Sequence, residues 1–263
     1  MGDTTGLDIS ESDVRRNCPG NLLSICWRQW RAERALARRG VHFRSVDPAA
    51  VAAAYAAMTA AEFDAINGRQ DWANWRTIPR ALSGHLPNQP LTVVDLGCGT
   101  GGSTRVLAFY CPLGSHIIAY EVAEPLLAVA RRRSYQHRSG KKAAVSFIRQ
   151  GVCEPLRQPL APISRRGNGS EASGVRAWPR TSIDIVNASG IVGHHLNAST
   201  AAPLIAEIER ILKPAGIAML DIGPTLDART LVQLMTAAGF EFLGRFRSWL
   251  FDPTGQAVFG KKS

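Results

Sequence analysis

The most informative part of the chain is residues 91–102, LTVVDLGCGTGG. The first six residues are mostly apolar and predict a short buried strand. The glycines that follow permit a tight turn, and a helix predicted to begin near Gly102 would direct its backbone N–H groups and its positive end toward a ligand. This order of strand, glycine loop and helix is typical of a nucleotide-type binding site.

The glycine loop by itself allows two interpretations. Gly97, Gly99 and Gly102 satisfy GxGxxG, the fingerprint of dinucleotide-binding domains. Gly97, Gly99 and Gly101 satisfy GxGxG, a pattern similar to that of class I S-adenosylmethionine-dependent methyltransferases. The choice between them depends on the neighbouring residues.

Three neighbours favour the second interpretation. Asp95 ends the strand two residues before the first glycine, and VVDLGCGTGG closely resembles the methyltransferase loop. Glu121 ends the second predicted strand, where a carboxylate can accept both hydroxyls of a ribose, a feature that by itself serves either cofactor. IERILKPAGIAMLDI, residues 208–222, resembles the segment around the fifth strand of the same family. The resemblance covers most of residues 91–263.

The resemblance extends less specifically to other segments. EFDAINGRQDWANWR, residues 62–76, is similar to the helix ahead of the glycine loop in ubiquinone/menaquinone-type and other small-molecule methyltransferases, where such helices cap the cofactor. By this likeness Trp72 and Arg76 border the cofactor, although two tryptophans at helical spacing also suit an ordinary core. GIVGHHL, residues 190–196, resembles the family's short motif after the fourth strand.

The resemblance implies that the cofactor is S-adenosyl-L-methionine and that the residues of the family's motifs contact it. No metal is expected. The family's aspartate at the end of the third strand is missing here, because Gly151 is followed by Val152, Cys153 and Glu154. We therefore expect Glu154, or a backbone carbonyl near Val152, to accept the hydrogen bond from the adenine amino group. The expected cofactor-binding residues are Asp95, Gly97, Cys98, Gly99, Gly101, Glu121, Val122, Val152, Cys153, Ser189, Trp72 and Arg76.

Methyl transfer from a sulfonium needs mainly placement of donor and acceptor, so no catalytic motif has to be visible. A hydroxyl or thiol acceptor must lose a proton, and His194 or His195 beside the methyl site is the candidate base. The alternative is that one histidine holds the loop and the other faces water.

The rest of the chain predicts an α/β fold with a doubly wound, mostly parallel, seven-stranded Rossmann-like sheet. Short apolar runs predict strands at residues 91–96, 116–121, 145–149, 183–188 and 216–222, with helices beginning near Gly102, Pro125, Ser199 and Asp227. Residues 241–251 and 256–262 alternate and predict an antiparallel hairpin joined by a turn at Asp-Pro-Thr-Gly. We expect a helical cap at residues 1–88 and the methyltransferase domain at residues 89–263.

Three helices are predicted in the cap. Residues 21–39 form an amphipathic helix whose Leu22, Leu23, Cys26, Trp27, Trp30 and Leu36 are expected to pack on the neighbouring domain, although a basic helix with tryptophans can also rest on a membrane or an RNA. Asp47 and Pro48 begin an alanine-rich helix that runs to about Ile66. The third helix covers residues 71–82, and Pro79 is expected to kink or shorten it.

The chain has 263 residues and a net charge of +10, which at first suggests nucleic-acid binding. Seven of these charges come from residues 135–182, and the basic stretch at about 155–181 is rich in turn-forming residues, which predicts a long surface loop. A nucleic-acid partner is therefore disfavoured but not excluded.

The five cysteines form no CxxC pair and indicate free thiols in a reducing cytoplasm. The first 13 residues lack the apolar region of a secretory signal, and no apolar stretch has the roughly 20 residues of a membrane span. The sequence therefore predicts a cytoplasmic enzyme that methylates a small or medium-sized metabolite at an O, N, S or C atom. An NAD(P)-dependent oxidoreductase and a non-catalytic methyltransferase-like partner are the alternatives, and a homodimer is left open.

Overall fold

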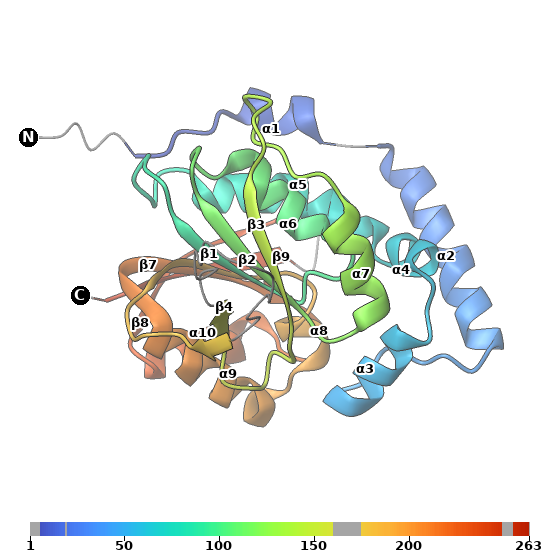
Figure 1. Ribbon diagram of the computed structural model, residues 1–263. Coiled ribbons are helices and arrows are strands. Elements are labelled where there is room, and N and C mark those ends of the chain that lie inside the picture. The colour runs from blue at the N-terminus through green and yellow to red at the C-terminus, as the bar shows by residue number, and fades with distance from the viewer. Residues whose placement is uncertain (1–5, 19, 160–174, 249–254, 263) are drawn as a thin grey trace, which may run out of the picture.

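The computed structural model describes residues 6–18, 20–159, 175–248 and 255–262, and a seven-stranded sheet lies at its centre (Figure 1). The strand order is β3-β2-β1-β6-β7-β9-β8. The first five of these strands are parallel, and β9 pairs antiparallel with both β7 and β8. The strands are β1 (Thr92–Leu96), β2 (His116–Glu121), β3 (Ala144–Arg149), β6 (Ile183–Ala188), β7 (Leu212–Ile222), β8 (Phe240–Phe246) and β9 (Gly255–Lys261).

This architecture confirms the predicted doubly wound sheet and its C-terminal antiparallel strands. Each of the five predicted parallel strands is present. The turn predicted between β8 and β9 lies mostly outside the described residues.

The strands are apolar because both faces of the sheet are covered. Val93 of β1 belongs to one hydrophobic cluster, and its neighbours Val94 and Leu96 belong to the other. Successive side chains of a strand point to opposite faces, so a continuous apolar run is what a doubly covered strand requires. On one face lie α5 (Gly68–Leu82) and α6 (Gly102–Tyr110), and on the other lie α9 (Ala198–Ile211) and α10 (Ala228–Ala237). Two further helices, α7 (Glu124–Arg132) and α8 (Val192–His195), follow β2 and β6.

The predicted helix over residues 48–66 is two helices, α3 (Pro48–Ala56) and α4 (Ala60–Ile66). Thr59 is the reason for the break. Its hydroxyl accepts a hydrogen bond from the backbone N–H of Glu62, and the Glu62 carboxylate accepts from the backbone N–H of Thr59. This capping box begins a new helix. Asp47 caps α3 as predicted.

Two other helix predictions need correction. Pro79 does not shorten its helix: α5 continues through Pro79 to Leu82, and both side chains are buried. Proline has no N–H to donate to the carbonyl of Trp75 four residues earlier, so the helix loses one hydrogen bond there, and the buried contacts of Pro79 and Leu82 hold this last turn in place. The helix α2 (Leu22–Arg38) buries Ile25 and Leu36, whereas the predicted packing residues Leu23, Trp27 and Trp30 are exposed.

The predicted surface loop at 155–181 contains regular structure at both ends. Strands β4 (Arg157–Pro159) and β5 (Val175–Ala177) pair as a two-stranded antiparallel sheet. They attach to the core because the Tyr120 hydroxyl donates to the carbonyl of Arg157 and accepts a 2.7 Å hydrogen bond from Trp178 Nε1. Residues 160–174 of the predicted loop lie outside the described residues. The remaining helix is α1 (Glu11–Asn17), which packs near α5.

Candidate functional site

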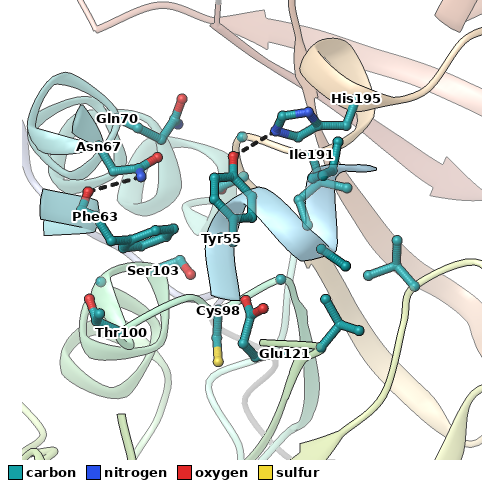
Figure 2. Close-up of a pocket in the computed structure, with 18 of the residues that line it drawn as sticks. Tyr55, Phe63, Asn67, Gln70, Cys98, Thr100, Ser103, Glu121, Ile191 and His195 are labelled. Carbon is teal, nitrogen blue, oxygen red and sulfur yellow. Dashed lines mark hydrogen bonds between the residues drawn. The ribbon is translucent and has the colours of Figure 1, made fainter. Parts of the chain in front are cut away.

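A cavity of about 650 Å³ lies at the carboxyl ends of β1, β2, β3 and β6. Its floor is formed by the residues that follow these strands, and its roof by side chains of α3, α4 and α5 (Figure 2). Ligands of doubly wound sheets bind at this edge, and the volume is in the range of small-molecule sites.

The glycine loop forms the central part of the floor. Gly97, Gly99 and Gly101 all have positive φ, at +63°, +55° and +92°. A Cβ on Gly97 would overlap the Ile191 side chain, and a Cβ on Gly99 would overlap the ring of Phe63. The loop therefore requires glycine for its backbone conformation and for close packing against both α4 and the segment after β6.

Glu121 joins the glycine loop to the end of β2. Its two carboxylate oxygens accept hydrogen bonds from the backbone N–H groups of Gly99, at 2.9 Å, and Ala123, at 2.8 Å. The side chain is buried, and burial raises its pKa, while these N–H donors act in the opposite direction. Each oxygen keeps a lone pair for a ligand hydroxyl, and the residue lines the cavity.

Asp95 lies beneath the loop and does not line the cavity. Its carboxylate accepts hydrogen bonds from Ser103 Oγ, Thr104 Oγ1 and Asn187 Nδ2 at 2.9, 2.6 and 2.8 Å. Burial raises the pKa of Asp95, and the three donors oppose that rise. The residue thus connects β1, α6 and β6 below the ligand space.

Three buried polar atoms at the cavity have no hydrogen-bond partner among the described residues: Asp71 Oδ1, Arg105 Nε and Gln150 Oε1. Asp71 and Arg105 face each other, with 3.3 Å between Oδ2 and Nη2. The Gln150 amide is oriented by Nε2, which donates to the carbonyl of Pro155 at 2.9 Å. Buried polar atoms of native proteins are nearly always paired. Each of these three has almost no accessible surface in this structure, so it can pair with a polar ligand only after its side chain turns toward the cavity.

At the other end of the cavity, His195 meets Tyr55 of α3 (Figure 2). His195 Nε2 lies 2.8 Å from the Tyr55 hydroxyl, and Nδ1 lies 3.3 Å from the carbonyl of Ser45. A carbonyl oxygen can only accept, so Nδ1 carries the hydrogen and Nε2 accepts from Tyr55. Burial lowers the pKa of His195, so its imidazole is neutral at pH 7.

The structure brings nine of the contact and catalytic residues expected from the sequence to the cavity: Gly97, Cys98, Glu121, Val122, Val152, Cys153, Glu154, Ser189 and His195. Six do not line it: Asp95, Gly99, Gly101, Trp72, Arg76 and His194.

Trp72 and Arg76 lie away from the cavity, on another side of α5. The Arg76 guanidinium stacks 3.5 Å from the centre of the Trp72 ring, and the Cys18 thiol points to the Trp72 carbonyl. His194 Nε2 lies 4.0 Å from Asp221 Oδ2. Asp221 in turn accepts hydrogen bonds from the backbone N–H groups of residues 191–193, so this pair lies at the start of α8.

Sequence reasoning missed most of the roof. Tyr55, Phe63 and Asp64 line the cavity from α3 and α4, which had been expected only as parts of an unbroken capping helix. The signal available was the capping-box pattern at Thr59 and Glu62, which marks the helix break that turns these residues inward. Gln150, directly after β3, was missed because the family comparison drew attention to the residues after Gly151.

Within the described part of the chain, no cluster of three or more His, Cys, Asp or Glu side chains has an arrangement that could hold a metal ion. None of its helices combines the length and apolarity needed to cross a bilayer.

Comparison with known families matches residues 94–220 to the model of a methyltransferase domain. No curated protein matches the chain. Among solved structures, the chain is similar to a putative methyltransferase in complex with the Haloferax volcanii Trm112 methyltransferase activator. The identity is 16%, the match covers 78% of this chain and 98% of that one, and the TM-score is 0.53. At this identity the likeness shows a shared fold.

Two further similarities have lower TM-scores. An S-adenosylmethionine-dependent methyltransferase from Mesorhizobium loti is 15% identical over 74% of this chain and 99% of that chain, with a TM-score of 0.49. Magnesium protoporphyrin IX methyltransferase from Synechocystis, solved with bound S-adenosylmethionine, is 14% identical over 66% of this chain and 72% of that chain, with a TM-score of 0.47.

Proposed function

We propose that the chain is a class I S-adenosylmethionine-dependent methyltransferase whose methyl acceptor is a small or medium-sized metabolite bound between the sheet edge and α3. The observation that supports this proposal most strongly is the cavity itself. Its lining includes the polar side chains of Glu121 and Asp71, and Pro48, Val51 and Ala52 of α3 add apolar groups. A cofactor and a compact acceptor can share such a space.

The residues of the cavity fit the cofactor. Glu121 can accept both ribose hydroxyls with the lone pairs left free by Gly99 and Ala123. The unpaired Asp71 Oδ1 and Arg105 Nε form an acceptor and a donor that match the ammonium and carboxylate groups of the amino-acid end. The unpaired Gln150 Oε1 is an acceptor for the adenine amino group and replaces the missing aspartate of the family.

When bound, S-adenosylmethionine supplies a methyl group activated by the positive charge on sulfur. The chain then has to hold the acceptor in line and exclude water. Such positioning can lower the barrier by about 7–11 kcal/mol, more than a single general base contributes. The α3 and α4 side chains that roof the cavity perform this enclosure.

We propose that His195 takes the proton from a hydroxyl acceptor. Its imidazole is neutral, and Nε2, which lies against the Tyr55 hydroxyl, carries no proton. The carbonyl of Ser45 accepts the hydrogen of Nδ1 and so fixes this tautomer. Tyr55 occupies the position of an acceptor hydroxyl in this structure, because it donates to the same nitrogen. For His194 we propose a structural role at the start of α8, beside Asp221.

The test is calorimetric titration with S-adenosylhomocysteine, with NAD(P) as the competing ligand of the oxidoreductase alternative. We expect micromolar or tighter binding of the first and none of the second. Gln150→Ala and Asp71→Asn should each weaken binding by about 1–3 kcal/mol, since each removes a buried hydrogen bond. Binding of NAD(P) in place of S-adenosylhomocysteine would contradict the proposal, and absence of both would favour a non-catalytic partner.

The acceptor is identified by adenosylhomocysteine release over a panel of phenols, quinones, amines, thiols and lipid headgroups. His195→Gln should abolish most turnover of hydroxyl acceptors while leaving adenosylhomocysteine affinity intact. Equal turnover by the variant would remove His195 as the base.

We also propose a cytoplasmic location, because Cys18, Cys26, Cys98, Cys111 and Cys153 are all free thiols.

A further inference from the structure

The outward face of α2 carries a row of large apolar side chains. Leu23, Trp27 and Trp30 are 80%, 58% and 46% exposed. Their spacing of four and three residues places them on one side of the helix. The two indole rings stack on each other, with centroids 5.1 Å apart and an interplanar angle of 22°. An ordered, exposed aromatic pair of this kind is unusual on a surface that contacts only water.

The opposite face of α2 anchors the helix to the protein. Leu36 is fully buried in a cluster with Met58 and Ile66, and Ile25 is also buried. Since these contacts already hold α2 in place, the exposed row is not needed for folding. The helix lies at the edge of the molecule, far from the sheet (Figure 1).

The same outward face is strongly basic. Arg31, Arg34 and Arg38 are exposed on this side of the helix, and Arg28 is exposed on its flank. Within the described residues none of these four arginines forms an ion pair. Arg34 lies over the Trp30 ring, 4.7 Å from its centroid. The single acidic residue of α2, Glu33, is paired with Arg44. The face thus combines apolar side chains with uncompensated positive charge.

We propose that this face of α2, defined by Leu23, Trp27, Trp30, Arg31, Arg34 and Arg38, is a docking surface for an anionic phospholipid bilayer. Helices that lie in a membrane interface insert Trp and Leu side chains at the level of the headgroups, and their arginines attract anionic lipids. Both components are present on this one face.

Two other occupants fit less well. Nucleic acid binds to aromatic side chains by stacking bases on free ring faces, but Trp27 and Trp30 cover each other and Arg34 covers Trp30. Leu23, the most exposed side chain of the row, offers nothing to a base or a phosphate. A second copy of the chain would bring two unneutralised arginine clusters together, which like-charge repulsion opposes.

The position of α2 links this surface to the cavity. The helix packs on α4, whose Phe63 and Asp64 line the cavity roof together with Asn67, the residue that follows the helix. Docking through α2 would therefore bring the roof helices close to the bilayer. The inference does not depend on the proposed acceptor, because it rests only on residues outside the cavity.

The test is flotation of the full-length protein with large unilamellar vesicles of phosphatidylcholine, with and without phosphatidylglycerol. We expect binding to the anionic vesicles and at least about tenfold weaker binding to neutral vesicles. Binding should also fall at high salt, since screening weakens the arginine contribution. The double variant Trp27→Ala/Trp30→Ala should reduce anionic-vesicle affinity by about tenfold or more.

Matched control variants distinguish binding through α2 from nonspecific adsorption of the protein to vesicles. Leu113→Ala removes an apolar side chain that is 42% exposed outside α2, and Arg229→Gln removes an exposed arginine of α10, so both variants should bind vesicles like the wild type. Adenosylhomocysteine affinity reports that the double variant is folded. Undiminished vesicle binding by the double variant, equal binding to neutral vesicles, no vesicle binding, or retention only by mixed-sequence RNA would each overturn the proposal.

Discussion

Glu121 holds the glycine loop and the proposed ribose contact together. Replacement by alanine removes a charged acceptor, and losing hydrogen bonds to a charged group costs about 1.5–3 kcal/mol. We therefore expect Glu121→Ala to weaken S-adenosylhomocysteine binding by roughly tenfold to 150-fold in calorimetric titration. Glu124→Ala, an exposed carboxylate in the first turn of α7, is the matched control. Wild-type affinity in Glu121→Ala would place the ribose elsewhere.

Asp95 is expected to matter for stability more than for ligand contact. In Asp95→Asn the new amide NH₂ must face Ser103 and Thr104 or the NH₂ of Asn187, all of which donate hydrogen bonds to the carboxylate. Asn187 cannot easily turn, because its Oδ1 accepts from Gln256 at 2.7 Å. The unmatched donors should lower the free energy of unfolding by about 1–3 kcal/mol, measured by urea denaturation. An unchanged midpoint would contradict this network.

His195 makes stability depend on pH in a defined direction. Its folded pKa is below the ordinary value of 6.5 because it is buried, so the unfolded chain binds more protons between the two values. The contribution of the neutral imidazole is complete above pH 6.5 and is lost as pH falls through the folded pKa. His195→Gln should therefore show a shallower decline of unfolding free energy below pH 6.5 than the wild type. Parallel pH profiles for the two proteins would contradict the burial of a neutral His195.

Where the end of a strand fixed its position, a residue expected at the site from the sequence lies at the cavity. Glu121 and Val122 arrive at the cavity because β2 ends there, and Ser189 arrives because β6 ends beside β1. Trp72 was expected at the cofactor from the resemblance to a capping helix, whereas its helical spacing with Trp75 also suited an ordinary core. The structure turns this residue away from the cavity, where Arg76 covers it.

At the scale of elements, α4 is attached to the methyltransferase core by few polar contacts. Asp64 accepts hydrogen bonds from Thr100 Oγ1 and from Arg133 Nη2, the latter at 2.6 Å. Because these groups are partly exposed, their loss should cost only about 1 kcal/mol. We expect Asp64→Ala to increase amide hydrogen exchange over residues 48–66 while β1 keeps its protection, since local opening need not involve the sheet. If amide hydrogen exchange in α3 and α4 is the same in Asp64→Ala as in the wild type, apolar packing alone holds the cavity roof in place.

The regular elements differ in how far the sequence determines them. Strands β1, β2 and β6 were predictable because burial on both faces demands an unbroken apolar run. The division of residues 48–66 was less visible, because alanine-rich sequence continues past Ala56 and only the Thr59 side chain marks the new start. For α2, the sequence favoured burial of the face with Leu23, Trp27 and Trp30, whereas the structure buries Ile25 and Leu36.

At the scale of the whole molecule, sheet topology followed from the alternation of strands and helices together with the right-handed crossover. The position of the helical cap did not follow, because contacts between α4 and the glycine loop join residues about 36 positions apart through side chains such as Thr100 and Asp64. The packing of β4 and β5 depends in the same way on Tyr120 and Trp178, which are 58 residues apart in the chain. Long-range contacts of this kind have no local sequence pattern.

The most direct test of the central claim is a crystal structure of the protein with S-adenosylhomocysteine. We expect the ribose hydroxyls on Glu121, the amino-acid end beside Asp71 and Arg105, and the adenine beside Gln150, with Phe63 and Tyr55 closing the cavity. A ligand bound outside this cavity, or a cavity in which Phe63 and Tyr55 exclude the ligand at saturating concentration, would contradict the assignment of the site.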